Sequence, residues 1–259
     1  MKNIIVFLTV KPCLDFYNFT KKLVKDKYDV YICIDDNNYK IPNYDNVIPL
    51  IYINNKECEN AGFKDTVSYC PNKACSRDKA LYYFVKNKID YKYIWFIEDD
   101  VFIPTINTIS DIDKKYECDL LCPPIEEKVE TEQVMMKSKW CHWKRKCSKI
   151  KLNFPWVHGM ICAIRVSRNM IDCIANYAKK YKSLFFCEIM FQTLALQNNL
   201  SIIHPYELYT IFYIMEWEKD DIKPFHLYHP IKDYKTHSYF RSEKLIIKNN
   251  LQDWMIYKK

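Results

Sequence analysis

The chain has 259 residues, of which 49% are hydrophobic and 27% are charged, a balance typical of globular proteins with a large buried core. Its formal net charge of +7 is a mild excess, and much of that excess lies in one segment. No apolar run reaches the length of about 18 residues that a membrane span needs, so we expect no transmembrane segment.

Glycine is the most informative absence. The sequence contains only Gly62 and Gly159. A Walker loop, a dinucleotide-binding turn and a kinase glycine loop each need several glycines for close approach of the backbone to phosphate. These three kinds of nucleotide site are therefore excluded. If the protein handles a nucleotide, a metal ion and side chains must neutralise most of the phosphate charge.

Twelve cysteines are present without a Cys-x-x-Cys pair. Because we expect no secretion signal, we predict mostly reduced thiols and a cytoplasmic location. Cys162 lies in an apolar run, where a free cysteine behaves as a small hydrophobic residue. Zinc binding is the alternative, either at Cys141-His142 with Cys147 or at His226 and His229.

The first elements predict a βαβ unit. Residues 3–10 are interpreted as a strand, since a lysine–proline pair follows them without the cleavage site of a signal peptide. Residues 15–25 have helical spacing, and residues 29–34 predict a second, parallel strand. Ligands of open α/β sheets lie beyond the carboxyl ends of the strands. Asp35 and Asp36 lie there, either as ligands of a base or ribose or as an ordinary polar turn.

The next segment leads to a helix. Residues 47–53 predict a third strand at the edge of the sheet, because Pro49 cannot donate a ladder hydrogen bond. Residues 54–72 are interpreted as irregular, and residues 75–88 predict a helix. Arg77 in its first turn could bind a phosphate or pair with a strand-end aspartate, and an ordinary surface position is the alternative.

An acidic cluster follows the strand predicted at 93–97. Glu98, Asp99 and Asp100 end this apolar and aromatic run. Three adjacent carboxylates cannot stay buried and charged unless something positive meets them. The cluster therefore predicts a divalent cation held by oxygen ligands, and a solvated acidic turn is the alternative.

A basic segment occupies the middle of the chain. Residues 119–122 predict a short strand, and residues 125–155 show weak periodicity. Within this stretch, residues 137–151 carry seven lysines and arginines with Trp140 and Trp143 among them. We favour a solvated lid loop, since long loops in compact domains are often lids. Binding of nucleic acid or another anionic surface is the alternative.

A lone carboxylate marks the second half of the chain. Residues 161–166 predict a strand, and Ser167 can cap the helix that follows it. Gly159 before this strand indicates a positive φ or a close backbone approach. Glu188 lies among apolar residues at the start of a further helix, where burial raises a carboxyl pKa and suits general-base chemistry. The alternative is a first-turn glutamate favoured by the helix dipole.

Taken in chain order, these features resemble a glycosyltransferase of the GT-A fold. The Glu-Asp-Asp cluster is similar to the DxD motif of that family, with glutamate in place of the first aspartate. The features that carry the resemblance are Asp35-Asp36, Arg77-Asp78, residues 95–100, residues 156–159, Cys187-Glu188 and residues 228–232. The resemblance implies a mixed, mostly parallel α/β sheet flanked by helices in a single compact domain, 1–259. Residues 1–105 would bind the nucleotide sugar and residues 106–259 the acceptor.

The resemblance also implies a metal site. Asp100 would bind Mn²⁺ or Mg²⁺ at the donor diphosphate, supported by Glu98, and Asp99 would contact the ribose or the metal shell. His229 would be a late ligand of the metal or diphosphate, with His237 as its substitute. A histidine in such a position is otherwise more often structural.

The remaining roles concern the two substrates. Asp35 or Asp36 would hold the base of the donor, for which a UDP-sugar is favoured. Glu188 would deprotonate a hydroxyl of a glycan or glycoprotein acceptor, with inversion at the sugar. The other residues expected at the nucleotide sugar are Arg77, His158, Gly159 and Lys232.

Two other functions stay open. Metal-dependent nucleotidyl transfer also uses strand-end carboxylates, but it normally needs a glycine loop or carboxylates on adjacent strands. A non-enzymatic binder of nucleic acid or an anionic surface would use residues 137–151, although we expect no nucleic-acid partner. The Lys-, Ile-, Asn- and Tyr-rich composition resembles proteins of large DNA viruses, which would place the protein in the host cytoplasm.

Overall fold

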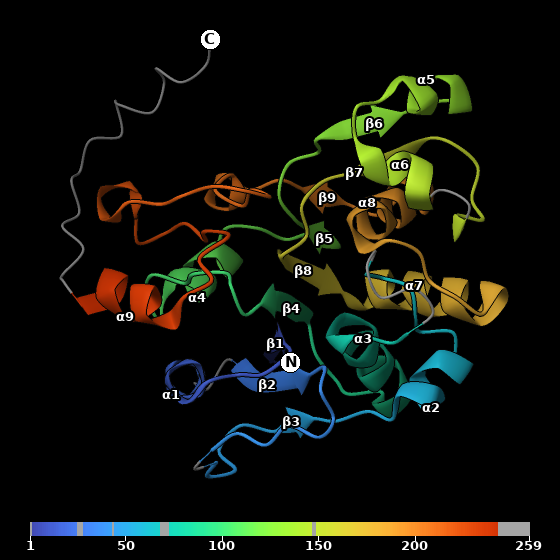
Figure 1. Cartoon of the computed structure of the whole chain (residues 1–259). Coiled ribbons are helices and arrows are strands. Elements are labelled where there is room, and N and C mark those ends of the chain that lie inside the picture. The colour runs from blue at the N-terminus through green and yellow to red at the C-terminus, as the bar shows by residue number, and fades with distance from the viewer. Residues whose placement is uncertain (1, 25–27, 43, 68–72, 147–148, 243–259) are drawn as a thin grey trace.

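A seven-stranded sheet runs through the computed structural model in the order β3-β2-β1-β4-β8-β5-β9 (Figure 1). Its strands are β1 (Asn3–Thr9), β2 (Tyr28–Ile34), β3 (Leu50–Ile51), β4 (Tyr93–Glu98), β5 (Leu120–Leu121), β8 (Ala163–Ser167) and β9 (Ile202–Ile203). A separate pair joins β6 (Glu127–Val129) and β7 (Trp156–His158). The structure describes residues 2–24, 28–42, 44–67, 73–146 and 149–242, with the backbone alone at 144–146.

The sheet is mixed and mostly parallel. Strands β3, β2, β1 and β4 run parallel to one another, and β5 runs parallel to β9. Strand β8 runs antiparallel to both of its neighbours, β4 and β5. The α/β architecture expected from the sequence is confirmed, including the parallel βαβ unit at the start of the chain.

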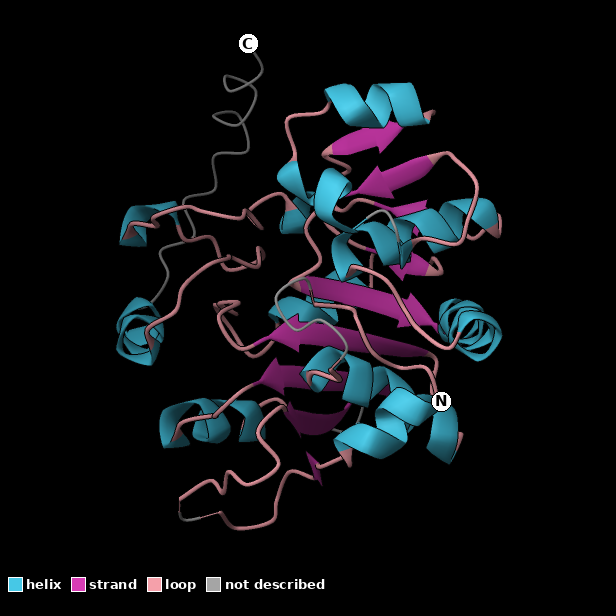
Figure 2. Cartoon of the chain, turned by 45° about the vertical axis from the view of Figure 1, so that its right-hand side comes forward, coloured by secondary structure: helices cyan, strands magenta, loops and turns pink. Residues whose placement is uncertain are grey.

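Helices lie on both sides of the sheet (Figure 2). One core contains residues of α3 (Ser76–Asn87), α7 (Arg168–Tyr181) and α8 (Cys187–Gln197), and the other contains residues of α1 (Leu14–Lys21) and α4 (Thr108–Asp113). Ile4 and Val6 of β1 belong to the first core and Ile5 to the second. Because β1 is buried on both faces, its sequence is an almost continuous apolar run.

The remaining helices are shorter or lie nearer the end of the chain. They are α2 (Asn55–Asn60), α5 (Glu132–Lys137), α6 (Cys141–Lys146), α9 (Tyr234–Ser242) and the 3₁₀ turns η2 (Tyr206–Leu208) and η3 (Lys219–Asp221). Among the described residues, no helix combines the length and the apolar character needed to cross a membrane.

Two predictions in the first third of the chain need correction. Residues 54–72, expected to be irregular, contain α2, whose first turn is capped where the Glu57 amide donates to the Asn54 side chain at 3.2 Å. A helix this short and polar has too few apolar positions for a periodic pattern. The strand expected at 47–53 pairs only over the two residues of β3, which does lie at the edge of the sheet as predicted.

The prediction of a solvated lid loop in the basic segment is wrong for its described part. The segment forms β6, α5 and α6, and Trp143 is completely buried. The Trp143 indole donates a hydrogen bond to the Glu127 carboxylate at 2.7 Å, and the Lys149 ammonium lies 2.7 Å from the Asp65 carboxylate. The basic and aromatic surface considered as a nucleic-acid site therefore lacks one of its two tryptophans.

A buried ion pair ties α4 to the sheet. The Arg165 guanidinium on β8 lies 2.7 Å from the Asp113 carboxylate, and the two side chains are 0% and 8% exposed. Asp113 also accepts hydrogen bonds from the Trp95 indole at 3.0 Å, from the Asn3 amide at 2.9 Å and from the Tyr28 hydroxyl. This carboxylate therefore compensates a buried charge and satisfies three further donors.

We predict that Asp113→Ala lowers the free energy of unfolding by about 3–5 kcal/mol, because it leaves the Arg165 charge buried without a partner. Urea unfolding measures the change. The matched control is Asp111→Ala on the same helix, which removes an exposed ion pair with Lys114 and should cost less than about 1 kcal/mol. Equal effects of the two substitutions would contradict the prediction.

Candidate active site

The acidic residues lie at the carboxyl edge of the sheet, which we define as the ends of β1, β2 and β4. Parallel strands end on the same side of a sheet, and Leu8 pairs with Glu98 across the β1–β4 ladder. Strand β8 runs the other way and therefore begins at this edge. The Glu98 amide donates to the Cys162 carbonyl at 2.8 Å, which holds the entry to β8 beside the end of β4.

Two cavities open at the carboxyl edge and share Glu98 and Asp100 in their walls. The smaller cavity measures about 210 Å³, and its other polar lining residues include Thr9, Asp35, Arg77 and Asp99. The larger cavity measures about 570 Å³, and its other lining residues include Cys162, Glu188, Tyr213, His229 and Lys232. The structure thus brings most of the predicted site residues to two adjoining spaces.

Arg77 lies beneath the acidic cluster and is 2% exposed. Its Nη2 atom donates to the Glu98 carboxylate at 2.6 Å and to the Ile161 carbonyl at 3.3 Å. The pairing expected with a strand-end aspartate is therefore made with the glutamate. The ion pair gives the Glu98 carboxylate a positively charged partner at the end of a buried strand.

His229 faces the other side of the cluster. Its Nε2 atom lies 3.3 Å from Asp100 Oδ1, and its Nδ1 atom lies 2.5 Å from the Phe212 carbonyl. The carbonyl can only accept, so Nδ1 carries a proton and Nε2 is the atom turned toward the cluster. Burial lowers the pKa of His229, but the neighbouring Asp100 carboxylate and the Phe212 carbonyl outweigh it and raise that pKa.

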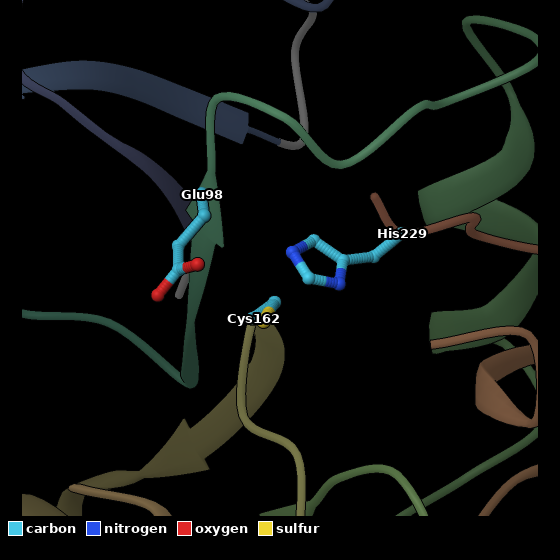
Figure 3. Close-up of side chains that lie close together, drawn as sticks. All are labelled: Glu98, Cys162 and His229. Carbon is cyan, nitrogen blue, oxygen red and sulfur yellow. The ribbon is translucent and has the colours of Figure 1, made fainter. Parts of the chain in front are cut away.

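Within the described residues, three metal-binding side chains converge at one place. Ligand atoms of Glu98, Cys162 and His229 lie within 4.8 Å of one another (Figure 3). Asp100 Oδ1 beside them is buried, and it lies 3.3 Å from His229 Nε2. Carboxylate oxygens suit Mn²⁺ or Mg²⁺, and an imidazole completes a set of divalent-cation ligands. The residues present therefore fit a divalent cation.

Of the residues in the two alternative zinc sites, His229 alone belongs to this cluster of described residues. Cys141 is exposed on α6, and Cys147 lies outside the described residues. His226 is buried against the Tyr206 ring at a centroid distance of 4.7 Å. Cys162 belongs to the buried core, as its apolar run predicts, and its thiol also lies in this cluster, which was not predicted from the sequence. Only the antiparallel direction of β8, which the sequence does not reveal, places it at the carboxyl edge.

Glu188 is the second residue of α8 and lines the larger cavity. Burial is the main cause that raises its pKa to about 8, and the charges of Glu126 and Glu98 add to this effect. Arg77 and His229 act in the opposite direction. The apolar surroundings predicted from the sequence thus outweigh the helix dipole in setting the pKa of this carboxyl group.

The predicted nucleotide ligands separate into two groups. Asp35 and Asp99 line the smaller cavity, whereas Asp36 accepts a hydrogen bond from the Asn38 amide at 3.0 Å and pairs with Lys11, as in the polar-turn alternative. Burial raises the pKa of Asp99 to about 6, although a hydrogen bond from the Thr9 hydroxyl opposes the shift. The pKa of Asp99 therefore lies above the ordinary range of a carboxyl group.

Three other predicted residues do not line either cavity. His158 is buried under Trp140, with ring centroids 3.8 Å apart, and burial lowers its pKa to about 4. His237, considered as a substitute for His229, is buried beside the Ile231 carbonyl at 2.7 Å. Gly159 has no positive φ. A Cβ atom there would lie 2.6 Å from the Pro124 carbonyl oxygen, so the close approach of the two backbone segments explains the glycine.

The fold and site define an α/β protein in which carboxylates, a thiol and an imidazole lie together at the carboxyl edge of the sheet. No protein-family model and no curated protein matches the chain. Among solved structures, it is similar to galactosyltransferase LgtC in complex with donor and acceptor sugar analogs, at 9% identity and a TM-score of 0.38, over 77% of this chain and 72% of that one. It is also similar to A197 from STIV, at 14% identity and a TM-score of 0.29, over 66% and 68% of the two chains. Similarity at this level carries no information about activity.

We predict that Glu188→Gln stabilises the protein at alkaline pH. The raised pKa means that folding favours the protonated carboxyl, so its contribution to stability is complete below pH 4.5 and is lost as pH rises toward about 8. Glutamine keeps the uncharged form at every pH. The thermal midpoint of the variant should exceed that of the parent by a few degrees near pH 9 and equal it near pH 4.

The control for this experiment is Glu132→Gln, on the exposed first turn of α5. It removes a carboxylate of the same kind and should produce no pH-dependent difference. A Glu188→Gln midpoint that follows the parent at both pH values would mean that Glu188 has an ordinary pKa.

Proposed function

We propose that the protein is a metal-dependent glycosyltransferase that moves a sugar from a nucleotide-diphosphate sugar to a hydroxyl of a glycan or glycoprotein. The observation that carries this proposal is the pair of adjoining cavities. One cavity has hydrogen-bond acceptors for a nucleoside, the other contains a buried carboxylate with base character, and Glu98 and Asp100 lie between them.

The nucleoside occupies the smaller cavity. Asp35 and Asp99 offer acceptors for the base and the ribose hydroxyls beyond the ends of β2 and β4, where open α/β sheets bind their ligands. The Lys79 ammonium fixes the loop there, because it donates to the Asp35 carbonyl at 2.6 Å. We expect a pyrimidine nucleotide such as UDP there, as the resemblance to GT-A glycosyltransferases implies.

The diphosphate lies over the shared wall. With few glycines in the chain, side chains must hold the phosphates: Lys232 lines the larger cavity, and Glu98, Asp100 and His229 would hold the cation. A bound Mn²⁺ or Mg²⁺ would neutralise the charge that develops on the leaving diphosphate.

Glu188 activates the acceptor. Its carboxylate takes the proton of the acceptor hydroxyl while that oxygen bonds to the anomeric carbon and the bond from this carbon to the diphosphate oxygen breaks. A base acts best when its pKa lies near the working pH, which matches the raised pKa of Glu188. An in-line arrangement of acceptor, sugar and diphosphate across the larger cavity gives inversion.

We predict that one nucleotide class, most strongly UDP, raises the thermal midpoint only when Mn²⁺ is present. A ligand at a hundredfold its dissociation constant adds about 2.7 kcal/mol, which is several degrees for a chain of this size. Thermal shifts of UDP, GDP, CDP and their sugars, each with and without Mn²⁺, measure the effect.

Asp100→Asn should abolish this stabilisation, because it removes a charged cation ligand. Asp36→Asn is the matched control, since Asp36 lines neither cavity, and it should retain the shift. The proposal fails if no nucleotide shifts the midpoint of the folded protein, or if the shift is the same without metal.

We also predict that Glu188→Gln binds the donor normally but transfers its sugar about 10²–10⁴-fold more slowly, the usual range for loss of a general base. Release of UDP from the nucleotide sugar, with water as the acceptor, measures transfer without a known acceptor. In the parent protein this rate should rise with pH as Glu188 loses its proton. A normal rate in the variant would exclude Glu188 as the base.

A further inference from the structure

A thiol lies among the oxygen and nitrogen ligands of the cation site. Cys162 Sγ is within 4.8 Å of ligand atoms of Glu98 and His229, and all three side chains line the larger cavity (Figure 3). The sequence predicted a site of carboxylates and imidazole, which favours hard cations. A sulfur ligand changes the preference, because thiolates select softer metals such as zinc.

The position of Cys162 is fixed by the sheet. The residue immediately precedes β8, and its carbonyl accepts the Glu98 amide hydrogen bond at 2.8 Å. Cys162 is 6% exposed, and its thiol forms no disulfide. The sulfur therefore reaches the cavity from a rigid part of the molecule, as a preorganised metal ligand requires.

The charge of the site suits a thiophilic divalent cation. The thiol lies beside the carboxylates of Glu98 and Asp100 in the wall of the larger cavity, and this negative charge favours a divalent cation. The Asp100 carboxylate lies on the same wall, with Oδ1 3.3 Å from His229 Nε2, and offers a further oxygen ligand.

We propose that Cys162 is a direct metal ligand and that the Glu98–Cys162–His229 cluster takes Zn²⁺ in preference to Mg²⁺ or Mn²⁺. Three protein ligands of the types S, N and O leave a zinc ion with an open position toward the larger cavity, where a phosphate oxygen can bind. This inference rests on the proposed cation site but does not depend on glycosyl transfer.

The test uses Co²⁺ as a coloured substitute for zinc in metal-free, reduced, full-length protein. A thiolate bound to Co²⁺ gives a near-ultraviolet charge-transfer absorption that carboxylate and imidazole ligands do not give. We expect this absorption in the parent protein, its loss on addition of one equivalent of Zn²⁺, and its persistence in excess Mg²⁺. In Cys162→Ser the absorption should disappear and the zinc affinity should fall by at least about tenfold.

Two variants keep the test decisive. Cys141→Ser removes the exposed thiol of the alternative zinc pair and should retain the absorption. His229→Gln removes the nitrogen ligand, and it should weaken Co²⁺ binding while retaining the sulfur absorption at saturation. Circular dichroism and thermal unfolding of each variant show that it is folded.

The possible results separate cleanly. An absorption that survives in Cys162→Ser, or that is lost in Cys141→Ser alone, overturns the inference and transfers the thiol site to another cysteine. Displacement of Co²⁺ by Mg²⁺ as readily as by Zn²⁺ overturns the metal preference. A sulfur absorption that depends on Cys162 supports the inference even if no nucleotide binds, so its failure and that of the proposed function are distinguishable.

Discussion

The constraint on which the site depends is the compensation of charge at the end of β4. Carboxylates cannot be taken out of water without a partner, and Glu98, Asp99 and Asp100 follow a strand that is buried along its length. Arg77 compensates the cluster from beneath, and His229 faces it from the side of the larger cavity. Among the described residues, Asp99 has no such partner charge in the cluster. Burial raises its pKa, which favours the protonated, uncharged form.

The sequence could predict the elements of this arrangement because local pattern dictates them. The apolar runs of β1, β2 and β4, the helical spacing of α3 and the Ser167 cap of α7, which accepts from the Met170 amide at 3.3 Å, follow from periodicity and capping alone. The parallel start then requires the residues after β2 and β4 to meet at one edge. That is why the acidic cluster and Asp35 were placed correctly relative to the sheet.

The direction of each strand and the burial of the aromatic side chains could not be predicted from the sequence. An apolar run at 161–166 predicts a strand in either direction, yet only the antiparallel one brings Cys162 to the carboxyl edge. Three late histidines look alike in sequence, and tertiary packing turns only His229 toward the cluster. The tryptophans of the basic segment suggested a binding surface. In the structure the Trp143 indole donates a hydrogen bond to the Glu127 carboxylate, and the Trp140 ring stacks on the His158 ring.

The electrostatic coupling between the cation site and Glu188 connects binding with chemistry. The pKa of Glu188 is raised partly by the charge of Glu98, a residue of the cation cluster. A divalent cation held by that cluster would favour the carboxylate form of Glu188, because an adjacent positive charge stabilises a carboxylate. The side chains proposed to hold the cation would therefore also influence the protonation state of the proposed base.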